Sequence, residues 1–253
     1  MSPTAPEYGV LRTVTPIASV LLEENPGPMT LDGTNTWILR APGERTCVVV
    51  DPGEADVEHL TRVADAGRVT LILLTHRHVH HVEGAPWLAA RTGAPIRAYD
   101  PTRCRDAEPL TSTETIRASG LEIQVVHTPG HTDDSVCFRV GKAVLTGDTI
   151  VGRGTTMVTS LGDYLDTLRL LAAIPDALVL PGHGDARCDL ASVAGAYLAH
   201  REERLRQVQD ALTRLGPDVS ASAIVDVVYA GLDAGLRGPA ERSVEAQLEY
   251  LRR

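Results

Sequence analysis

The sequence of 253 residues is poor in aromatic side chains, in lysine and in long apolar runs. Aromatic residues make up 4% of it and phenylalanine occurs once, as Phe138, so we expect a mainly aliphatic core. No stretch approaches the roughly 18 to 20 apolar residues that a membrane-spanning helix needs. The first residues have neither a basic segment nor an apolar run of the kind found in secretory signals. We therefore expect a cytoplasmic protein with no membrane partner.

Cysteine and positive charge are also scarce. The four cysteines are widely spaced and include no C-x-x-C pair, a pattern that favours buried thiols over disulfides or a zinc knuckle; they are Cys47, Cys104, Cys137 and Cys188. The formal net charge is −9. This charge disfavours a large nucleic-acid-binding face, because such affinity comes mainly from clustered Lys and Arg.

Up to about residue 190, short apolar runs alternate with polar turns and helical stretches, which is typical of an α/β domain. Expected strands cover residues 36–39, 46–50, 69–74, 121–126, 135–140, 143–145 and 177–180, and expected helices cover 55–66, 84–92 and 163–173. The two halves are similar enough to indicate two packed α/β layers. Beyond residue 190 only helices are expected, at 192–215, 221–230 and 240–251. We predict a catalytic domain at 1–190 and a C-terminal helical cap at 191–253.

The three expected helices at the C-terminus are similar to a winged-helix DNA-binding module. Residues 195–253 carry 8 Arg against 9 Asp and Glu. This balance favours a structural cap over a surface that binds phosphates.

Four of the apolar runs end in loops with potential metal ligands. The run 71–74 precedes four histidines, and the runs 123–126, 143–145 and 178–180 each precede one more candidate; the ligands in chain order are His76, His78, His80, His81, His131, Asp148 and His183. Loops at strand ends are held by a rigid sheet, so these side chains can converge. Imidazole with carboxylate suits zinc, and iron or manganese less specifically.

The spacing of these residues allows two ions to bind. His76 and His78 can face the same side of an extended turn and bind one ion, whereas the pair at 80 and 81 lies further along the turn and can serve a second. Asp148 has two oxygens and can bridge both ions. Two divalent ions roughly 3.5 to 4 Å apart can generate a hydroxide nucleophile near neutral pH and stabilise the oxyanion that forms.

In this order, His76-x-His78-x-x-His81, His131, Asp148 and His183 resemble the metallo-β-lactamase superfamily, and the match covers nearly the whole chain. Further segments resemble the branch with β-lactamase-like-protein-2 type enzymes, some of which are endoribonucleases; they are 25–26, 29–31, 33–36, 128–132, 152–156 and the helical tail. Similar proteins act as thioesterases in natural-product pathways. The resemblance implies an α/β fold, a four-layer αβ/βα sandwich with a C-terminal, winged-helix-like cap of three helices.

The resemblance also implies a ligand set. His76, His78 and His131 would hold a first metal, Asp148 would bridge, and His81 and His183 would hold a second. In the family an aspartate completes the second site and helps to orient the attacking water. This sequence has His80 at that position.

Three roles of His80 are open. It could ligate the second metal, turn away and leave one firmly held metal, or mark a protein disabled for hydrolysis, either naturally or by engineering. An imidazole is longer than a carboxylate, is neutral when it coordinates, and cannot bridge or accept two hydrogen bonds. We therefore expect a weakened second site and reduced hydrolysis.

Other polar residues have both structural and functional interpretations. We expect His127 to be packed and hydrogen-bonded, and His59 and His200 to lie at the surface. Asp51 is expected either to brace the metal loop or to form a simple turn. Asp133 and Asp134 either brace His131 or lie in a solvated turn. The loop after Asp148 could line the substrate cleft with Arg153, Thr155 and Thr156.

The sequence thus predicts a zinc-dependent hydrolase that acts on a thioester, ester, lactam or phosphodiester. We expect a small-molecule or acyl-carrier-bound substrate, with no indication of oligomeric state. The missing signal peptide argues against a secreted antibiotic lactamase. The alternatives are a disabled family member, an RNA-cleaving endoribonuclease and a mononuclear iron oxygenase.

Overall fold

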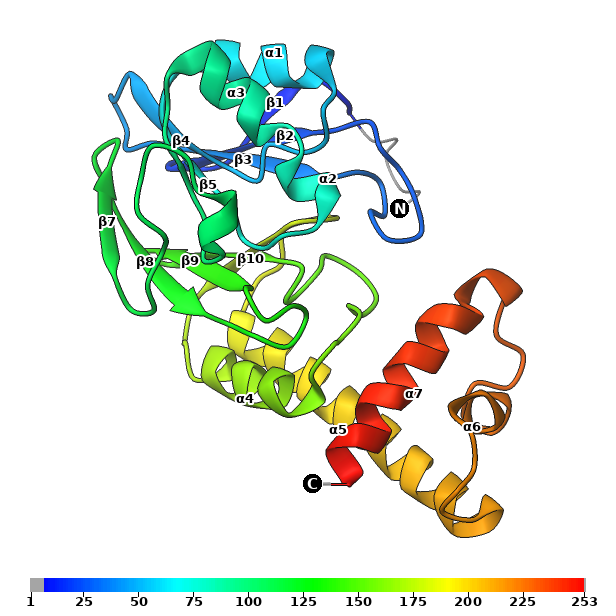
Figure 1. Ribbon diagram of the computed structural model, residues 1–253. Coiled ribbons are helices and arrows are strands. Elements are labelled where there is room, and N and C mark those ends of the chain that lie inside the picture. The colour runs from blue at the N-terminus through cyan, green and yellow to red at the C-terminus, as the bar shows by residue number, and fades with distance from the viewer. Residues whose placement is uncertain (1–6, 253) are drawn as a thin grey trace.

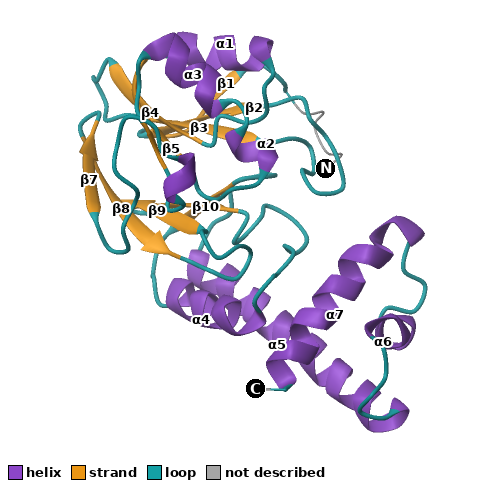
Figure 2. Ribbon diagram, in the orientation of Figure 1, coloured by secondary structure: helices purple, strands orange, loops and turns teal. Residues whose placement is uncertain are grey.

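Two β-sheets lie face to face, with helices on their outer sides (Figure 1, Figure 2). The structure is a computed structural model that describes residues 7–252. The first sheet has the order β1-β2-β3-β4-β5-β6 and contains β1 (Leu11–Thr15), β2 (Ala18–Leu22), β3 (Asn35–Leu39), β4 (Thr46–Val50), β5 (Arg68–Leu73) and β6 (Ile96–Arg97). The second has the order β11-β10-β9-β8-β7 and contains β7 (Thr115–Ala118), β8 (Leu121–His127), β9 (Val136–Val140), β10 (Ala143–Gly147) and β11 (Leu178–Pro181).

Strand sequences follow from where each strand lies. The parallel strands β4 and β5 are covered on both faces and consist almost entirely of aliphatic residues, as buried parallel strands do. By contrast, β8 alternates buried and exposed residues along Leu121–Val125, because only one of its faces packs on the core. Pairings β10–β11 and β5–β6 are also parallel, and the remaining pairings are antiparallel.

Aliphatic side chains fill the space between the sheets. Phe138 of β9 is fully buried there among residues of both sheets, including Val48, Leu73 and Leu145. On the outer face of the first sheet, α1 (Val57–Asp65) and α3 (Ala85–Thr92) bury a second cluster. The outer face of the second sheet is covered by α4 (Leu161–Ala172) and the first half of α5 (Leu190–Leu215). The predicted four-layer αβ/βα sandwich is confirmed.

Helices also form the C-terminal region. The second half of α5 packs with α6 (Ala221–Val228) and α7 (Arg237–Leu251) around their own small core. Among residues 7–252 no strand follows β11, so the three helices have no β-wing. Because α5 is one helix of 26 residues, it contributes Tyr197 to the core beneath the second sheet and Val208 to the C-terminal core. The division into two domains at residue 190 stays a prediction.

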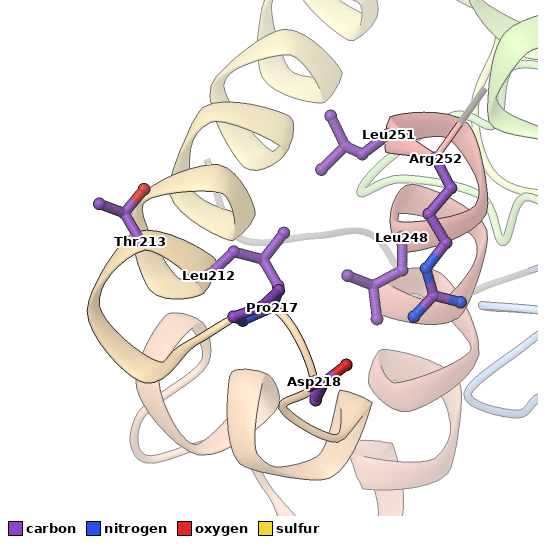
Figure 3. A pocket seen from close by; sticks show the side chains of 7 residues that line it. All are labelled: Leu212, Thr213, Pro217, Asp218, Leu248, Leu251 and Arg252. Atoms are coloured by element: carbon purple, nitrogen blue, oxygen red, sulfur yellow. The ribbon is translucent and has the colours of Figure 1, made fainter.

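A hollow of about 600 Å³ lies within the C-terminal helices (Figure 3). Its lining is partly apolar and comes from α5, α7 and the turn after α5, and includes Leu212, Leu248 and Leu251. None of the predicted metal ligands lines it. In the described chain, no helix has the length and hydropathy needed to cross a membrane.

Some sequence expectations differ from the structure. The strands β1, β2, β6 and β7 and the one-turn helix α2 (Val79–Val82) were not expected. β6 and α2 are short, and polar residues interrupt β1 and β7, whereas β2 is mainly apolar. His59 was expected at the surface, and this was wrong: the residue is 3% exposed and its Nε2 lies 2.8 Å from the Thr36 hydroxyl. Burial lowers the pKa of His59 to about 4. All four cysteines are free; Cys47 and Cys137 are buried, as expected, whereas Cys104 is half-buried and Cys188 is exposed.

The position of Phe138 generates a stability prediction. Replacement by alanine should lower the free energy of unfolding by about 3–5 kcal/mol, because it leaves a cavity between the two sheets. Guanidinium denaturation followed by circular dichroism measures this loss. Leu170→Ala is the control, since Leu170 is 46% exposed on α4, and should change stability by about 0.5 kcal/mol or less. A Phe138→Ala loss as small as that of the control would contradict the packing described here.

Candidate metal centre

The predicted ligands come from the ends of strands in both sheets. Beyond β5 the chain turns through His76 and His78 into α2, which holds His80 and His81. His131 lies in the loop between β8 and β9. Asp148 follows β10 directly and His183 follows β11 closely. Since β10 and β11 are parallel neighbours, their ends lie at the same edge of the second sheet.

Close approach at this edge requires small residues. A Cβ atom on Gly182 would lie 2.7 Å from His81 Cε1 and 2.8 Å from Asp148 Oδ1. Gly147 has φ +48°, and a Cβ there would lie 2.5 Å from the Thr75 hydroxyl. Glycine at these two positions therefore allows the strand ends and the histidine loop to meet.

Asp148 is the centre of the cluster. Its Oδ1 lies 3.3 Å from His183 Nε2 and 3.4 Å from His81 Nε2. Its Oδ2 lies 3.6 Å from His131 Nε2, 3.7 Å from His80 Nε2 and 3.8 Å from His76 Nε2. His78 does not reach this carboxylate closely, but its Nδ1 is 3.0 Å from Nε2 of both His76 and His131. The structure thus brings together all seven candidates.

Hydrogen bonds at the outer nitrogens set the tautomers of three histidines. His131 Nδ1 donates to the Met157 carbonyl (2.7 Å), His183 Nδ1 to the Gly33 carbonyl (3.0 Å) and His81 Nδ1 to the Asp51 carboxylate (2.9 Å). In a neutral ring, a proton on Nδ1 leaves the lone pair of Nε2 directed toward Asp148. This is the arrangement usual for metal-binding histidines, whose second nitrogen is held by a carbonyl or carboxylate.

Electrostatics inside the cluster reflects the crowding of these groups. Burial, with the other histidines nearby, holds the pKa of His76 well below its ordinary value and lowers that of His78 to about 4. Burial also opposes protonation of His81, but the carboxylates of Asp148 and Asp51 outweigh it and raise its pKa to about 10. For Asp148, burial opposes ionisation, yet His183 and His81 hold its pKa well below the usual range. An ionised carboxylate thus faces mainly neutral imidazoles.

The donor set fits divalent metal ions. Two overlapping groups have ligand atoms within 4.8 Å of one another: His76, His78, His131 and Asp148, and His76, His80, His81 and Asp148. His80 Nε2 and Asp148 Oδ1 are buried, and neither has a hydrogen-bond partner in the described part of the chain. Buried polar atoms without partners are costly, and a cation between them would satisfy both.

His80 turns into the cluster. The residue lies on α2, and its side chain is 19% exposed with Nε2 facing Asp148. The orientation that points His80 away from the cluster is not the one in the structure. Burial lowers the pKa of His80, which favours the neutral ring that can bind a metal.

Asp51 supports the histidine loop from behind. Its Oδ2 accepts from the Thr75 hydroxyl (2.6 Å) and from His81 Nδ1, and its Oδ1 accepts from the Thr75 amide (2.8 Å). Asp51 has φ 51°, a conformation that few residues other than glycine adopt, and these bonds help to hold it there. Of the two interpretations of Asp51, the brace is confirmed.

Comparison with known proteins identifies the family. The family model described as "Metallo-beta-lactamase superfamily" matches residues 29–183. This chain belongs to the metallo-β-lactamase superfamily. Membership confirms the family and the enzyme class that the sequence predicted, a hydrolase of this superfamily.

Individual members of the superfamily are similar over most of the chain. The "Atrochrysone carboxyl ACP thioesterase" of Aspergillus fumigatus is 33% identical over 223 residues, which cover 84% of this chain and 69% of that protein. The "Beta-lactamase-like protein 2 homolog" of Drosophila melanogaster is 30% identical over 250 residues, which cover 90% of this chain and 85% of that protein. A crystal structure of a "Beta-lactamase domain protein" from Burkholderia ambifaria superposes with a TM-score of 0.81 at 23% identity, over 99% of this chain and 90% of that one. This last likeness concerns the fold alone.

Ion pairs connect loops around this superfamily site. Arg77, between two of the histidines, pairs with both Asp133 and Asp134 and so ties the His76–His78 loop to the loop of His131. Arg153 pairs with Asp32 at 2.9 Å across two loops. His127 is packed and hydrogen-bonded as expected, since it stacks on Tyr99 and contacts the Asp133 carbonyl.

Residues of the loop after Asp148 differ in their surroundings. Thr155 is exposed, whereas Thr156 is buried with its hydroxyl 3.0 Å from His131 Nδ1. Contact of Arg153, Thr155 and Thr156 with a substrate stays a prediction. Sequence reasoning missed Glu23. Its carboxyl group is buried and accepts a hydrogen bond from the Glu54 amide, in the segment that follows Asp51. No spacing pattern in the sequence marks this residue.

The bonds of Asp51 predict the effect of Asp51→Asn. An amide there must direct an N–H either at the Thr75 amide or at the His81 ring, so one hydrogen bond is lost and His81 is held less firmly. Loss of a group that orients a metal-binding histidine typically costs about 10- to 100-fold in metal affinity. Titration with zinc in competition with a chromophoric chelator measures this change in zinc affinity.

A matched control is Asp56→Asn. Asp56 caps the N-terminus of α1, outside the cluster, and asparagine caps helices about as well as aspartate. Equal zinc affinities of Asp51→Asn and Asp56→Asn would show that Asp51 does not orient a ligand.

Proposed function

We propose that this protein is a zinc-dependent hydrolase of thioesters, with an acyl-carrier-bound or related small acyl substrate. The observation that carries the proposal is the pair of overlapping four-residue groups that share His76 and Asp148. Zinc is the metal of choice for imidazole nitrogens together with one carboxylate. The net charge of −9 favours an acyl substrate over RNA.

Roles follow from the positions of the side chains. His76, His78 and His131 with Asp148 would hold the first ion, and His80, His81 and His183 with Asp148 the second. When bound, the ions supply Lewis acidity, which lets water lose a proton near neutral pH and stabilises negative charge on the attacked carbonyl oxygen. Met157, Gly33 and Asp51 hold the outer nitrogens of three rings, so the inner nitrogens keep their direction throughout the reaction.

The reaction is a simple hydrolysis. Water adds to the thioester carbonyl, the C–S bond breaks, and a carboxylic acid and a free thiol are released. Support for the thioester class comes from the similar Aspergillus fumigatus protein, which is named as an ACP thioesterase. A thiol is also a good leaving group, so the chemistry demands less of a weakened metal centre than cleavage of an amide would.

His80 limits this proposed activity. Its ring can provide one nitrogen to the second ion, yet it brings no negative charge and no second lone pair to orient water. The protein should therefore hold the first ion firmly and the second weakly, and hydrolysis should be slower than with a carboxylate at this position.

Replacement of His80 by aspartate tests the proposal. His80→Asp should raise the zinc content from about one ion per chain to about two, and should raise kcat/KM for a short acyl thioester about 10- to 100-fold. Atomic emission gives the metal content, and a thiol reagent follows the release of free thiol.

His80→Asn is the matched control, because it has the size of aspartate without its charge and should show neither increase. A parent protein that retains two zinc ions and matches His80→Asp in rate would contradict the weakened second site. Parallel assays on single-stranded RNA, and of iron content with oxygen uptake, separate a nuclease and an oxygenase from a thioesterase.

A further inference from the structure

The first half of α5 contacts the loop that supports His131. This loop, residues 151–157, runs from the end of the Asp148 turn toward α4. Two of its groups lie at the outer nitrogen of His131: the Met157 carbonyl at 2.7 Å and the Thr156 hydroxyl at 3.0 Å. The direction of the His131 ring thus depends on where this loop lies.

Beyond Gly152, whose amide donates to the His183 carbonyl at 2.8 Å, side chains rather than backbone pairing hold the loop. Within residues 7–252, no residue from 153 to 158 takes part in a backbone–backbone hydrogen bond. Two side chains of α5 provide bonds instead. The Tyr197 hydroxyl lies 3.2 Å from the Val151 carbonyl and 2.9 Å from the Gly154 carbonyl, and Arg201 Nη2 donates to the Thr156 carbonyl.

Tyr197 and Arg201 are one helical turn apart and so lie on the same face of α5. Tyr197 reaches the first half of the loop and Arg201 the second half. Together they hold the loop on both sides of its exposed residues Arg153 and Thr155.

Arg201 is an unusual buried cation. It is 7% exposed, and no ion pair joins it to a carboxylate in the described chain. Its guanidinium lies 5.4 Å from the centre of the Tyr164 ring and bonds the Thr156 carbonyl, while its Nε has no partner among the described residues. Burial of an arginine without a carboxylate is costly. General packing does not need this charge, since an apolar side chain would fill the same space.

We propose that Tyr197 and Arg201 are positioning residues that fix loop 151–157 and, through Thr156 and Met157, orient His131 toward a bound metal ion. Helix α5 would then support the metal centre as well as form part of the C-terminal cap. This inference rests on the proposed function in one respect, namely that His131 binds the first ion.

Two substitutions test the inference. Arg201→Met removes the donor to Thr156 but keeps an apolar side chain of similar length, and Tyr197→Phe removes only the hydroxyl. Each should lower zinc affinity about 10- to 100-fold, as loss of an outer support of a metal-binding histidine typically does. Each should also shift the visible absorption of the cobalt-substituted protein, because the His131 ring is reoriented.

Arg204→Met is the matched control on the same helix. Arg204 bonds Gln207 and the Val228 carbonyl and stacks on Tyr229, so it contacts the C-terminal helices and not the loop. Its zinc affinity should stay within about twofold of that of the parent protein. Its cobalt spectrum should be unchanged. Thermal unfolding of the metal-free proteins checks that all three variants fold.

The outcomes separate this inference from the proposed function. Zinc affinities and cobalt spectra of Arg201→Met and Tyr197→Phe that match Arg204→Met would overturn the inference. If Arg201→Met does not fold, Tyr197→Phe decides alone, because its ring stays in the core. Equal zinc affinity of the parent and His131→Ala would overturn the proposed function itself, and this inference with it.

Discussion

The buried carboxylate of Asp148 is the group on which the site depends. It is 6% exposed and faces five imidazole nitrogens, most of them neutral. An ionised carboxylate in such a position costs several kcal/mol unless positive charge compensates it. In the protein alone, a protonated His81 supplies part of that charge. Divalent ions would supply more, and they would also satisfy the lone pairs that the other rings direct inward. The charge and geometry of the site therefore suit a bound cation.

The direction of each ring is set by segments far away in the sequence. Gly33 precedes β3 in the first sheet and bonds His183, which follows β11 in the second. Asn35 connects the same regions, since its amide nitrogen donates to the Pro181 and Gly184 carbonyls. Because the two sheets hold each other's ligands, the cluster can form only once both have packed. The fold and the site are in this sense one cooperative structure.

The sequence singled out the seven side chains that the structure brings together, because histidines and carboxylates at strand ends leave strong local signals. Four histidines follow one aliphatic strand, and His131, Asp148 and His183 each lie next to a glycine after another strand. Both patterns are visible in the sequence itself. The supports leave weaker signals: Glu23 and Arg201 look like surface charges, and only the packing of distant segments buries them. His59 was placed wrongly for the same reason, because its partner Thr36 lies on another strand. Asp51 was left open, since a turn and a brace have the same local sequence. Edge strands such as β1 were missed because exposed residues interrupt their apolar pattern.

The exchange at position 80 acts on the two ligand groups unequally. The first group keeps its three histidines and the Asp148 carboxylate, and none of its members is changed from the family pattern. The second group shares His76 and Asp148 with the first. With His80 in place of the family's aspartate, it has no carboxylate of its own. Two unit charges 4 Å apart interact by about 4 kcal/mol at an effective dielectric constant of 20, and a divalent ion feels each lost charge more strongly. A neutral ring nitrogen restores a ligand atom but not this charge. The fold and the first ligand group are thus compatible with His80, whereas a metal ion in the second group would have less compensating negative charge.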